Sequence, residues 1–225
     1  MASRSSSSSS SRLLPPEFYS RPTPQVAHDL IGKVLVRVLD KKRRLAGVIV
    51  ETEAYGHADD PASHAHRGPT ARNRVMFGPV GVAYVYFTYG SHHCVNVSAR
   101  SPDRAPAGAV LIRSIEPVEG VGVMQNLRGT GNPLLLASGP GRLTQAMGIT
   151  LLQNGLDMTV PGSGLCIEEA GDLEGGRRQV VSTPRIGITK AADLPWRFVD
   201  PSSRFVSRRL PAFAPSIPEQ HSRSS

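Results

Sequence analysis

The chain has 225 residues, 39% of them hydrophobic and 20% charged, which is ordinary for a single domain with one substantial core. Its two cysteines lack Cys-x-x-Cys spacing, which excludes a zinc finger, and no apolar run is long enough to cross a bilayer. The formal net charge of +8 includes 22 Arg and only 4 Lys. Because arginine forks match phosphate oxygens, nucleic acid is the leading partner class, with a purely solubilising role as the alternative.

Both ends of the chain are predicted to be disordered tails. Residues 1–12 are serine-rich and lack the apolar centre of a secretory signal, and residues 211–225 are rich in Pro and Ser. The folded domain is therefore expected over residues 13–210. The absence of a secretory signal and the sparse cysteines favour an intracellular, reducing location, in the cytoplasm or nucleoid of a bacterium or the nucleus of a eukaryote.

The first half of the domain reads as a short helix followed by paired strands. Thr23-Pro24 opens a helix that runs to about Ile31. Residues 33–39 and 45–53 are rich in Val, Ile and Leu and predict two strands joined by a turn over residues 40–44. Residues 56–80 contain Gly, Pro, Asp and His without a clear period, and predict a long loop of a kind that is usually functional or disordered.

A predicted hairpin follows, formed by strands at 82–89 and 94–98 with Tyr89 near its tip. Strands concentrate early and helices interrupt the later sequence, which favours an α+β fold with a mainly antiparallel sheet, a protruding hairpin and short flanking helices. The remaining expected elements are strands at 109–115, 165–168, 179–182, 186–189 and 197–199, and helices at 118–127 and 142–147.

Two carboxylates near the end of the second strand are the leading catalytic candidates. Because strand side chains alternate, Glu51, Glu53 and Tyr55 share one face. A carboxylate in such a place can deprotonate water or stabilise a developing cation. Hydrolysis of an N-glycosidic bond requires both an activated water and a stabilised, cation-like sugar. The alternative is that either glutamate only pairs with an arginine at the sheet edge.

Three of the five tyrosines, Tyr84, Tyr86 and Tyr89, fall in one six-residue stretch of the predicted hairpin. Tyr86 and Tyr89 are three residues apart, so on a strand they face opposite sides. A ring lining a pocket can stack on a nucleobase, and a bulky side chain at a hairpin tip can fill the gap that an extruded base leaves. The alternative is that these residues simply build a well-packed strand.

The histidines of the long loop do not predict a metal site. His57, Asp59, Asp60, His64 and His66 fit no familiar zinc spacing, so we expect no metal and one histidine acting as a hydrogen-bond donor.

Other candidates concern DNA and the nucleophile. Arg72 and Arg74 follow a Gly-Pro turn and could clamp phosphates, while Ser138-Gly139-Pro140-Gly141 opens a helix whose free amides could bind phosphate or simply start a helix. No lysine lies in these segments, so water is the better nucleophile than a Schiff-base amine.

Several motifs in the same order resemble the 3-methyladenine DNA glycosylase family, of the alkyladenine type, from about Pro16 to Asp200. The residues that carry the resemblance are Val50 to Tyr55, His64, Asn73-Arg74, Met76-Phe77, Tyr84 to Tyr86, Tyr89-Gly90, Asn96, Leu111 to Arg113, Ser138 to Pro140, Pro184 to Gly187 and Pro195 to Phe198.

The resemblance implies a monofunctional base-excision-repair enzyme, without lyase activity, that flips alkylated or deaminated purines out of duplex DNA and hydrolyses the N-glycosidic bond. Glu53 would be the general base, and Arg113 and the main-chain carbonyl of Ile186 would help hold the water. The implied base pocket consists of Tyr55, His64, Tyr86 and Asn96, the last discriminating against the amino group of guanine, and Tyr89 would be the wedge in the duplex.

The sequence departs from vertebrate members at Ser91-His92-His93, where they carry larger apolar and aromatic residues. We expect double-stranded DNA as the partner, a monomer, no membrane association and no cofactor. A non-catalytic binder of damaged or bent DNA remains an alternative. So does a carbohydrate-acting hydrolase with Glu51 and Glu53 as its pair, although the basic charge and Tyr89 count against it.

Overall fold

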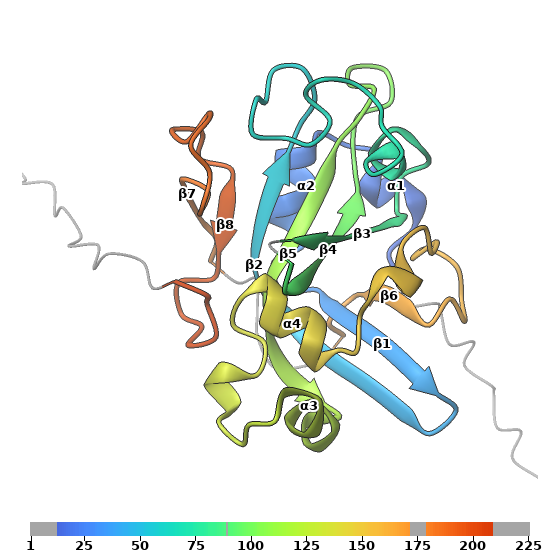
Figure 1. Ribbon diagram of the computed structural model, residues 1–225, viewed down its shortest axis with the longest axis vertical. Helices are drawn as coiled ribbons and strands as arrows, with labels where there is room; N and C mark the ends of the chain where they lie inside the picture. The colour runs from blue at the N-terminus through green and yellow to red at the C-terminus, as the bar shows by residue number, and fades with distance from the viewer. Residues whose placement is uncertain (1–12, 89, 172–178, 209–225) are drawn as a thin grey trace, which may run out of the picture.

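A computed structural model describes residues 13–88, 90–171 and 179–208 (Figure 1). Within these residues the strands form one antiparallel sheet in the order β3-β4-β5-β2-β1-β6, with β8 paired to β2 and β7 to β8. The predicted α+β class is confirmed. The strands are β1 (Val34–Asp40), β2 (Arg43–Tyr55), β3 (Ala83–Thr88), β4 (His92–Ser98), β5 (Ala109–Glu119), β6 (Leu165–Glu168), β7 (Val181–Thr183) and β8 (Arg197–Val199).

Short helices flank this sheet (Figure 1). Helix α2 packs on β2, and α4 packs on β4 and β5 while also contacting α3. The helices are α1 (Pro16–Tyr19), α2 (Thr23–Asp29), α3 (Val121–Arg128) and α4 (Pro140–Ala146), with 3-10 turns at Arg74–Phe77, Pro133–Leu135 and Leu151–Gln153.

The long strand β2 is the centre of the sheet. Strand β5 pairs along one edge of β2, while β1 pairs with its first half and β8 with Glu51, Thr52 and Glu53. The residues from Leu45 to Ala54 are consequently all buried. A strand hydrogen-bonded on both edges is rigid, so the two carboxylates project from a fixed backbone.

The buried apolar residues form a main core and two smaller clusters. The main core joins α2, through Val26 and Ala27, to the inward faces of the sheet and to the α3–α4 region. One smaller cluster lies on β1 and β2, and the other contains Met76 and Tyr84. The rings of Tyr55 and Tyr86 pack against its edge, so burial of apolar area holds the aromatic side chains that the sequence singled out.

Most predicted elements are confirmed, and their bounds shift where tertiary pairing extends them. Strand β5 continues to Glu119 because it stays paired with β2 as far as Ala46, whereas the sequence placed a helix from residue 118. The helix begins only at Val121, after Gly120, whose φ of +72° ends the strand. The turn between β1 and β2 spans only residues 41 and 42, and the strand predicted at 179–182 is observed as β7.

The strand predicted at 186–189 is wrong, because these residues form a loop. Gly187 has φ +74°, and the amide of Ile186 is turned toward a side chain of β2 rather than toward a neighbouring strand. Tyr89 and the two predicted tails, 1–12 and 211–225, lie outside the described residues. Over the part of the chain that the structure describes, no helix has the length and apolar character needed to cross a membrane.

Candidate active site

Glu53 is completely buried, yet its carboxylate is bound by three groups that all line one pocket. Its Oε1 accepts the backbone N–H of Ile186 at 2.7 Å. Its Oε2 accepts the hydroxyl of Tyr55 at 2.9 Å and Nη1 of Arg113 at 3.0 Å. Such donors fix the orientation of the carboxylate. The carboxylate therefore lies directly behind the pocket wall.

The carboxylate of Glu51, two residues earlier, is bound by buried arginines and a backbone amide. Its carboxylate accepts Nε of Arg113 at 2.9 Å, Nε of Arg197 at 2.8 Å and the amide of Ser207 at 2.6 Å. Although burial opposes ionisation, Arg113 and Arg197 hold the pKa of Glu51 below its ordinary value. Arg113 thus bridges both carboxylates, and Glu51 orients Arg113 from behind. This arrangement does not suit a carbohydrate hydrolase that uses the two glutamates as an open pair.

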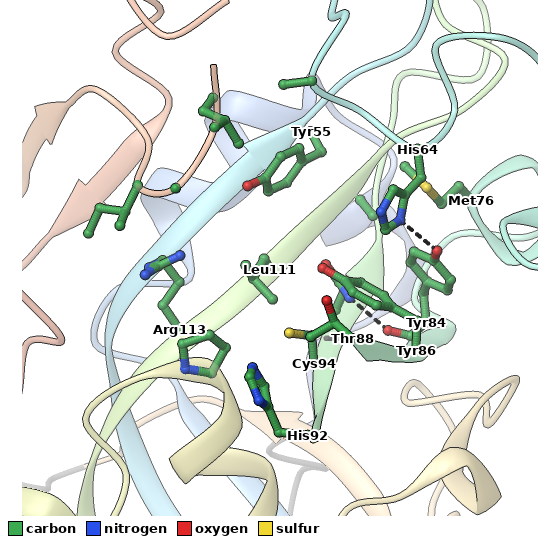
Figure 2. A pocket seen from close by; sticks show the side chains of 17 residues that line it. Tyr55, His64, Met76, Tyr84, Tyr86, Thr88, His92, Cys94, Leu111 and Arg113 are labelled. Atoms are coloured by element: carbon green, nitrogen blue, oxygen red, sulfur yellow. Dashed lines mark hydrogen bonds between the residues drawn. The ribbon is translucent and has the colours of Figure 1, made fainter. Parts of the chain in front are cut away.

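The pocket has a volume of about 400 Å³. Figure 2 shows Tyr55 on one side, with His64, Tyr84 and Tyr86 grouped opposite it. Leu111 lies between the two sides in this view, and Arg113 and His92 lie nearer the helix that begins at Pro140. Of the residues that the sequence nominated, Tyr55, His64, Tyr86, Asn96, Arg113 and Ile186 all line this one pocket.

The aromatic side of the pocket is held by edge contacts and hydrogen bonds. The rings of His64 and Tyr86 lie 4.7 Å apart at 74°, and Nδ1 of His64 is 2.9 Å from the Tyr84 hydroxyl. Desolvation of the ring and the charge of Arg72 lower the pKa of His64, so its imidazole is neutral at pH 7. Burial also favours the neutral form of Tyr84, whose pKa it raises to about 12. This side therefore offers neutral groups to a ligand.

Two further polar groups are fixed by β3 and β4. Asn96 is buried and donates its Nδ2 to the carbonyl of Tyr84 at 2.9 Å, so its carboxamide has a set orientation. Burial raises the pKa of the Cys94 thiol, which lines the pocket as a neutral group.

The candidate phosphate-binding residues fall in different environments. Arg72 and Arg74 are exposed, and the guanidinium of Arg72 lies 5.2 Å from the centroid of the Tyr86 ring. Ser138 is buried, and its hydroxyl donates to the carbonyl of Leu134, so it faces the interior. Gly139 and Gly141 are half-buried at the start of α4.

At Gly141 a Cβ atom would stand 2.6 Å from the ring of His92, so this glycine allows α4 to approach the pocket. His92 itself, part of the Ser91-His92-His93 departure, lines the pocket. The predicted wedge, Tyr89, lies outside the described residues, between Thr88, which also lines the pocket, and the exposed Gly90.

Several residues that shape the site were assigned no role in it from the sequence, although Arg185 and Arg197 lie in motifs that carry the family resemblance. Arg197 and Ser207 hold Glu51, and Asp60 forms a buried ion pair with Arg185 beside Tyr55. Asp60 drew notice only as a possible metal ligand, and Ser207 gave no signal at all. Among the described residues, no group of three or more His, Cys, Asp or Glu side chains is placed to bind a metal ion.

A ring-lined pocket beside a carboxylate, on an α+β sheet, is the site expected of a hydrolase that acts on N-glycosyl bonds. Residues 17–204 match the family model described as methylpurine-DNA glycosylase, and the chain belongs to this family. It is therefore an enzyme of the DNA glycosylase class.

Curated relatives are similar over most of the chain. A protein of Methanoculleus marisnigri named "Putative 3-methyladenine DNA glycosylase" is 52% identical over 87% of this chain and 99% of its own length. A protein with the same name in Rhodopseudomonas palustris is 46% identical, over 92% of this chain and 98% of its own length. Another in Carboxydothermus hydrogenoformans is 48% identical, over 88% of this chain and 100% of its own length.

Proposed function

We propose that this enzyme excises alkylated or deaminated purines from double-stranded DNA by hydrolysis of the N-glycosidic bond. The observation that carries the proposal is the bonding of Glu53, whose three donors each also line the pocket. The printed names of the relatives favour an alkylated adenine as one substrate. A flipped purine would lie in the pocket with its sugar toward Glu53.

In the proposed reaction the bond between C1′ and the purine nitrogen breaks, and its electron pair leaves with the base. A water molecule forms the new bond to C1′ and gives its proton to Glu53, while the carboxylate stabilises the oxocarbenium-like sugar. Arg113 and the carbonyl of Ile186 would hold this water. Alkylation at N3 or N7 makes the purine cationic and a better leaving group. Because no amine takes part, the enzyme would leave the DNA strand uncut.

The walls of the pocket would select the base. Tyr55 and Tyr86 offer ring faces on which a planar cation can stack, worth about 1–3 kcal/mol per base. His64, neutral at pH 7, would offer one hydrogen bond. Asn96 would exclude the exocyclic amino group of guanine sterically, because the bond from its Nδ2 to the carbonyl of Tyr84 holds the side chain in place.

The remaining parts of the proposal concern the duplex. Tyr89 would enter the gap left by the flipped nucleotide, and the exposed Arg72 and Arg74 would contact phosphates. The amides of Gly139 and Gly141 would add to this surface, whereas the internally bonded hydroxyl of Ser138 would not. We propose that a monomer performs all these steps.

The test is release of free base from matched duplexes. Duplexes carrying one 3-methyladenine, one hypoxanthine or no damage are incubated with excess protein, and free purine and abasic sites are measured by chromatography. We expect release from at least one damaged duplex, an intact strand until alkali is added, and no covalent complex after borohydride treatment. Tight binding of damaged duplex without any release would instead identify a non-catalytic binder.

A further inference from the structure

A buried ion pair lies next to the proposed catalytic carboxylate but does not touch it. Asp60, from the long loop after β2, and Arg185, from the loop before β8, both have completely buried side chains. Their two hydrogen bonds, Nη1 to Oδ2 at 2.7 Å and Nη2 to Oδ1 at 2.8 Å, form a bidentate fork. Such a fork fixes the orientation of both groups as well as their separation.

The Asp60–Arg185 pair joins three segments of the chain. Asp60 also accepts the backbone N–H of Gly56 at 2.9 Å, which ties the loop after β2 to its own beginning. Arg185 also donates Nη1 to the carbonyl of Ala54 at 2.9 Å, which ties the loop before β8 to the end of β2. These contacts satisfy both Nη atoms of Arg185 and both carboxylate oxygens of Asp60, while Nε of Arg185 is buried without a hydrogen-bond partner.

The guanidinium of Arg185 also lies against the aromatic ring that bounds the pocket. Its carbon is 4.8 Å from the centroid of the Tyr55 ring and 5.3 Å from that of Trp196. Cation–π contact of this kind holds Tyr55 by its ring, while the Tyr55 hydroxyl reaches Glu53.

The residue after Arg185 supplies the other fixed contact to the carboxylate. Ile186 donates its N–H to Oε1 of Glu53 at 2.7 Å, from a loop that is not part of a strand. With no strand neighbour to hold this loop, its backbone is anchored there by Arg185. Two of the three donors to Glu53 thus lie next to the same guanidinium: Tyr55 packs against it through its ring, and Ile186 follows Arg185 in the chain.

We propose that Asp60 and Arg185 are positioning residues for base excision, which set the donors of Glu53 without contacting the substrate. This inference rests on the proposed function of Glu53. It assigns a role to the long loop after β2 beyond lining the pocket with His64.

Two variants test the role of the Asp60–Arg185 pair. Asp60→Asn removes the charge of one partner, and Asp60→Asn combined with Arg185→Met removes both charges, so that no unpaired guanidinium remains buried. The control is Asp29→Asn, which breaks an Arg–Asp pair of the same 2.7 Å length, Arg21–Asp29, on α2 away from the pocket.

The first readout does not depend on activity. Amide hydrogen exchange at Ile186 is expected to accelerate at least tenfold in both variants, while the amide of Gly32, bonded to the carbonyl of Ile49 in the core, stays as protected as in the parent. The second readout is the single-turnover rate of base release per active site, expected to fall about 10- to 100-fold, the effect of losing a hydrogen bond to a charged group. Affinity for a duplex with an uncleavable abasic analogue should stay within about threefold.

The outcomes separate this role from a merely structural one. Unchanged Ile186 exchange and unchanged rate per active site would overturn the proposal, even if both variants melt earlier. Loss of the native fold in both would assign the pair to stability and overturn it as well. If the parent releases no base while Ile186 exchange still responds, the proposed function fails and the anchoring of the loop stands.

Discussion

Glu53→Gln is expected to slow base release at least 100-fold while leaving affinity for damaged duplex nearly unchanged. General-base catalysis contributes about 10²- to 10⁴-fold, and a carboxamide cannot take the proton of the attacking water. The substitution keeps the size of the side chain, and its oxygen can still accept the Ile186 amide that now binds Oε1 at 2.7 Å. Single-turnover kinetics with enzyme in excess isolate this chemical step from binding and product release.

A matched control separates chemistry from charge. Glu17→Gln, on the exposed face of α1, makes the same change in net charge and should leave both release and binding at parental values. Equal release by the parent and by Glu53→Gln would remove Glu53 from the mechanism. Loss of duplex binding together with release would point to a damaged fold or interface rather than to a missing base.

Glu51→Gln should have the largest effect on stability. Arg113 and Arg197 are both buried and both donate Nε to Glu51, so the variant removes the carboxylate partner of Arg197 and one of the two carboxylate partners of Arg113. Breaking a buried pair in this way costs about 3–5 kcal/mol, which lowers the melting temperature by roughly 6–20 °C in a domain of this size. Release per folded molecule should also fall, because Glu51 orients the Arg113 that binds Glu53.

The stabilisation by Glu51 should depend on pH. The pKa of Glu51 lies below its ordinary value of 4.5 in the folded protein, so its stabilisation is fully present above pH 4.5. It is lost as the pH falls through the lower, folded-state pKa. The free energy of unfolding of the parent, measured with denaturant, should therefore decrease as the pH falls through that acidic window. For Glu51→Gln the free energy of unfolding should depend less on pH over the same window.

The control for Glu51→Gln is Glu169→Gln. It breaks an exposed ion pair with Lys33 and should change the free energy of unfolding by no more than about 1 kcal/mol. If Glu51→Gln is as mild as this control, the network around Arg113 does not hold the site together. A large loss of stability with an unaltered rate per folded molecule would limit Glu51 to the fold.

Local sequence rules predicted the parts of the site that lie on one strand. Strand alternation placed Glu51, Glu53 and Tyr55 on one face, and in the structure Arg113 contacts both carboxylates while the Tyr55 hydroxyl donates to Glu53. The neighbouring strands β3 and β4 and the start of α4 could also be predicted, because turn residues and a Pro near the helix start are local signals.

The rest of the site depends on contacts between distant residues. Asp60 and Arg185 are 125 positions apart, and Ser207 lies 156 positions from Glu51, so no local pattern pairs them. The 186–189 segment has the composition of a strand, but the bond from its first amide to Glu53 keeps it a loop. In the same way, pairing with β2 extends β5 past the point where a helix was predicted.

The most direct test is a crystal structure of the Glu53→Gln variant bound to a duplex with one hypoxanthine. We predict that the purine lies outside the helix between Tyr55 and Tyr86, with its sugar C1′ facing residue 53 and a water molecule within about 3 Å of the carboxamide. A base that remains stacked in the duplex, or a pocket filled while residue 53 stays walled off from the sugar, would contradict the account.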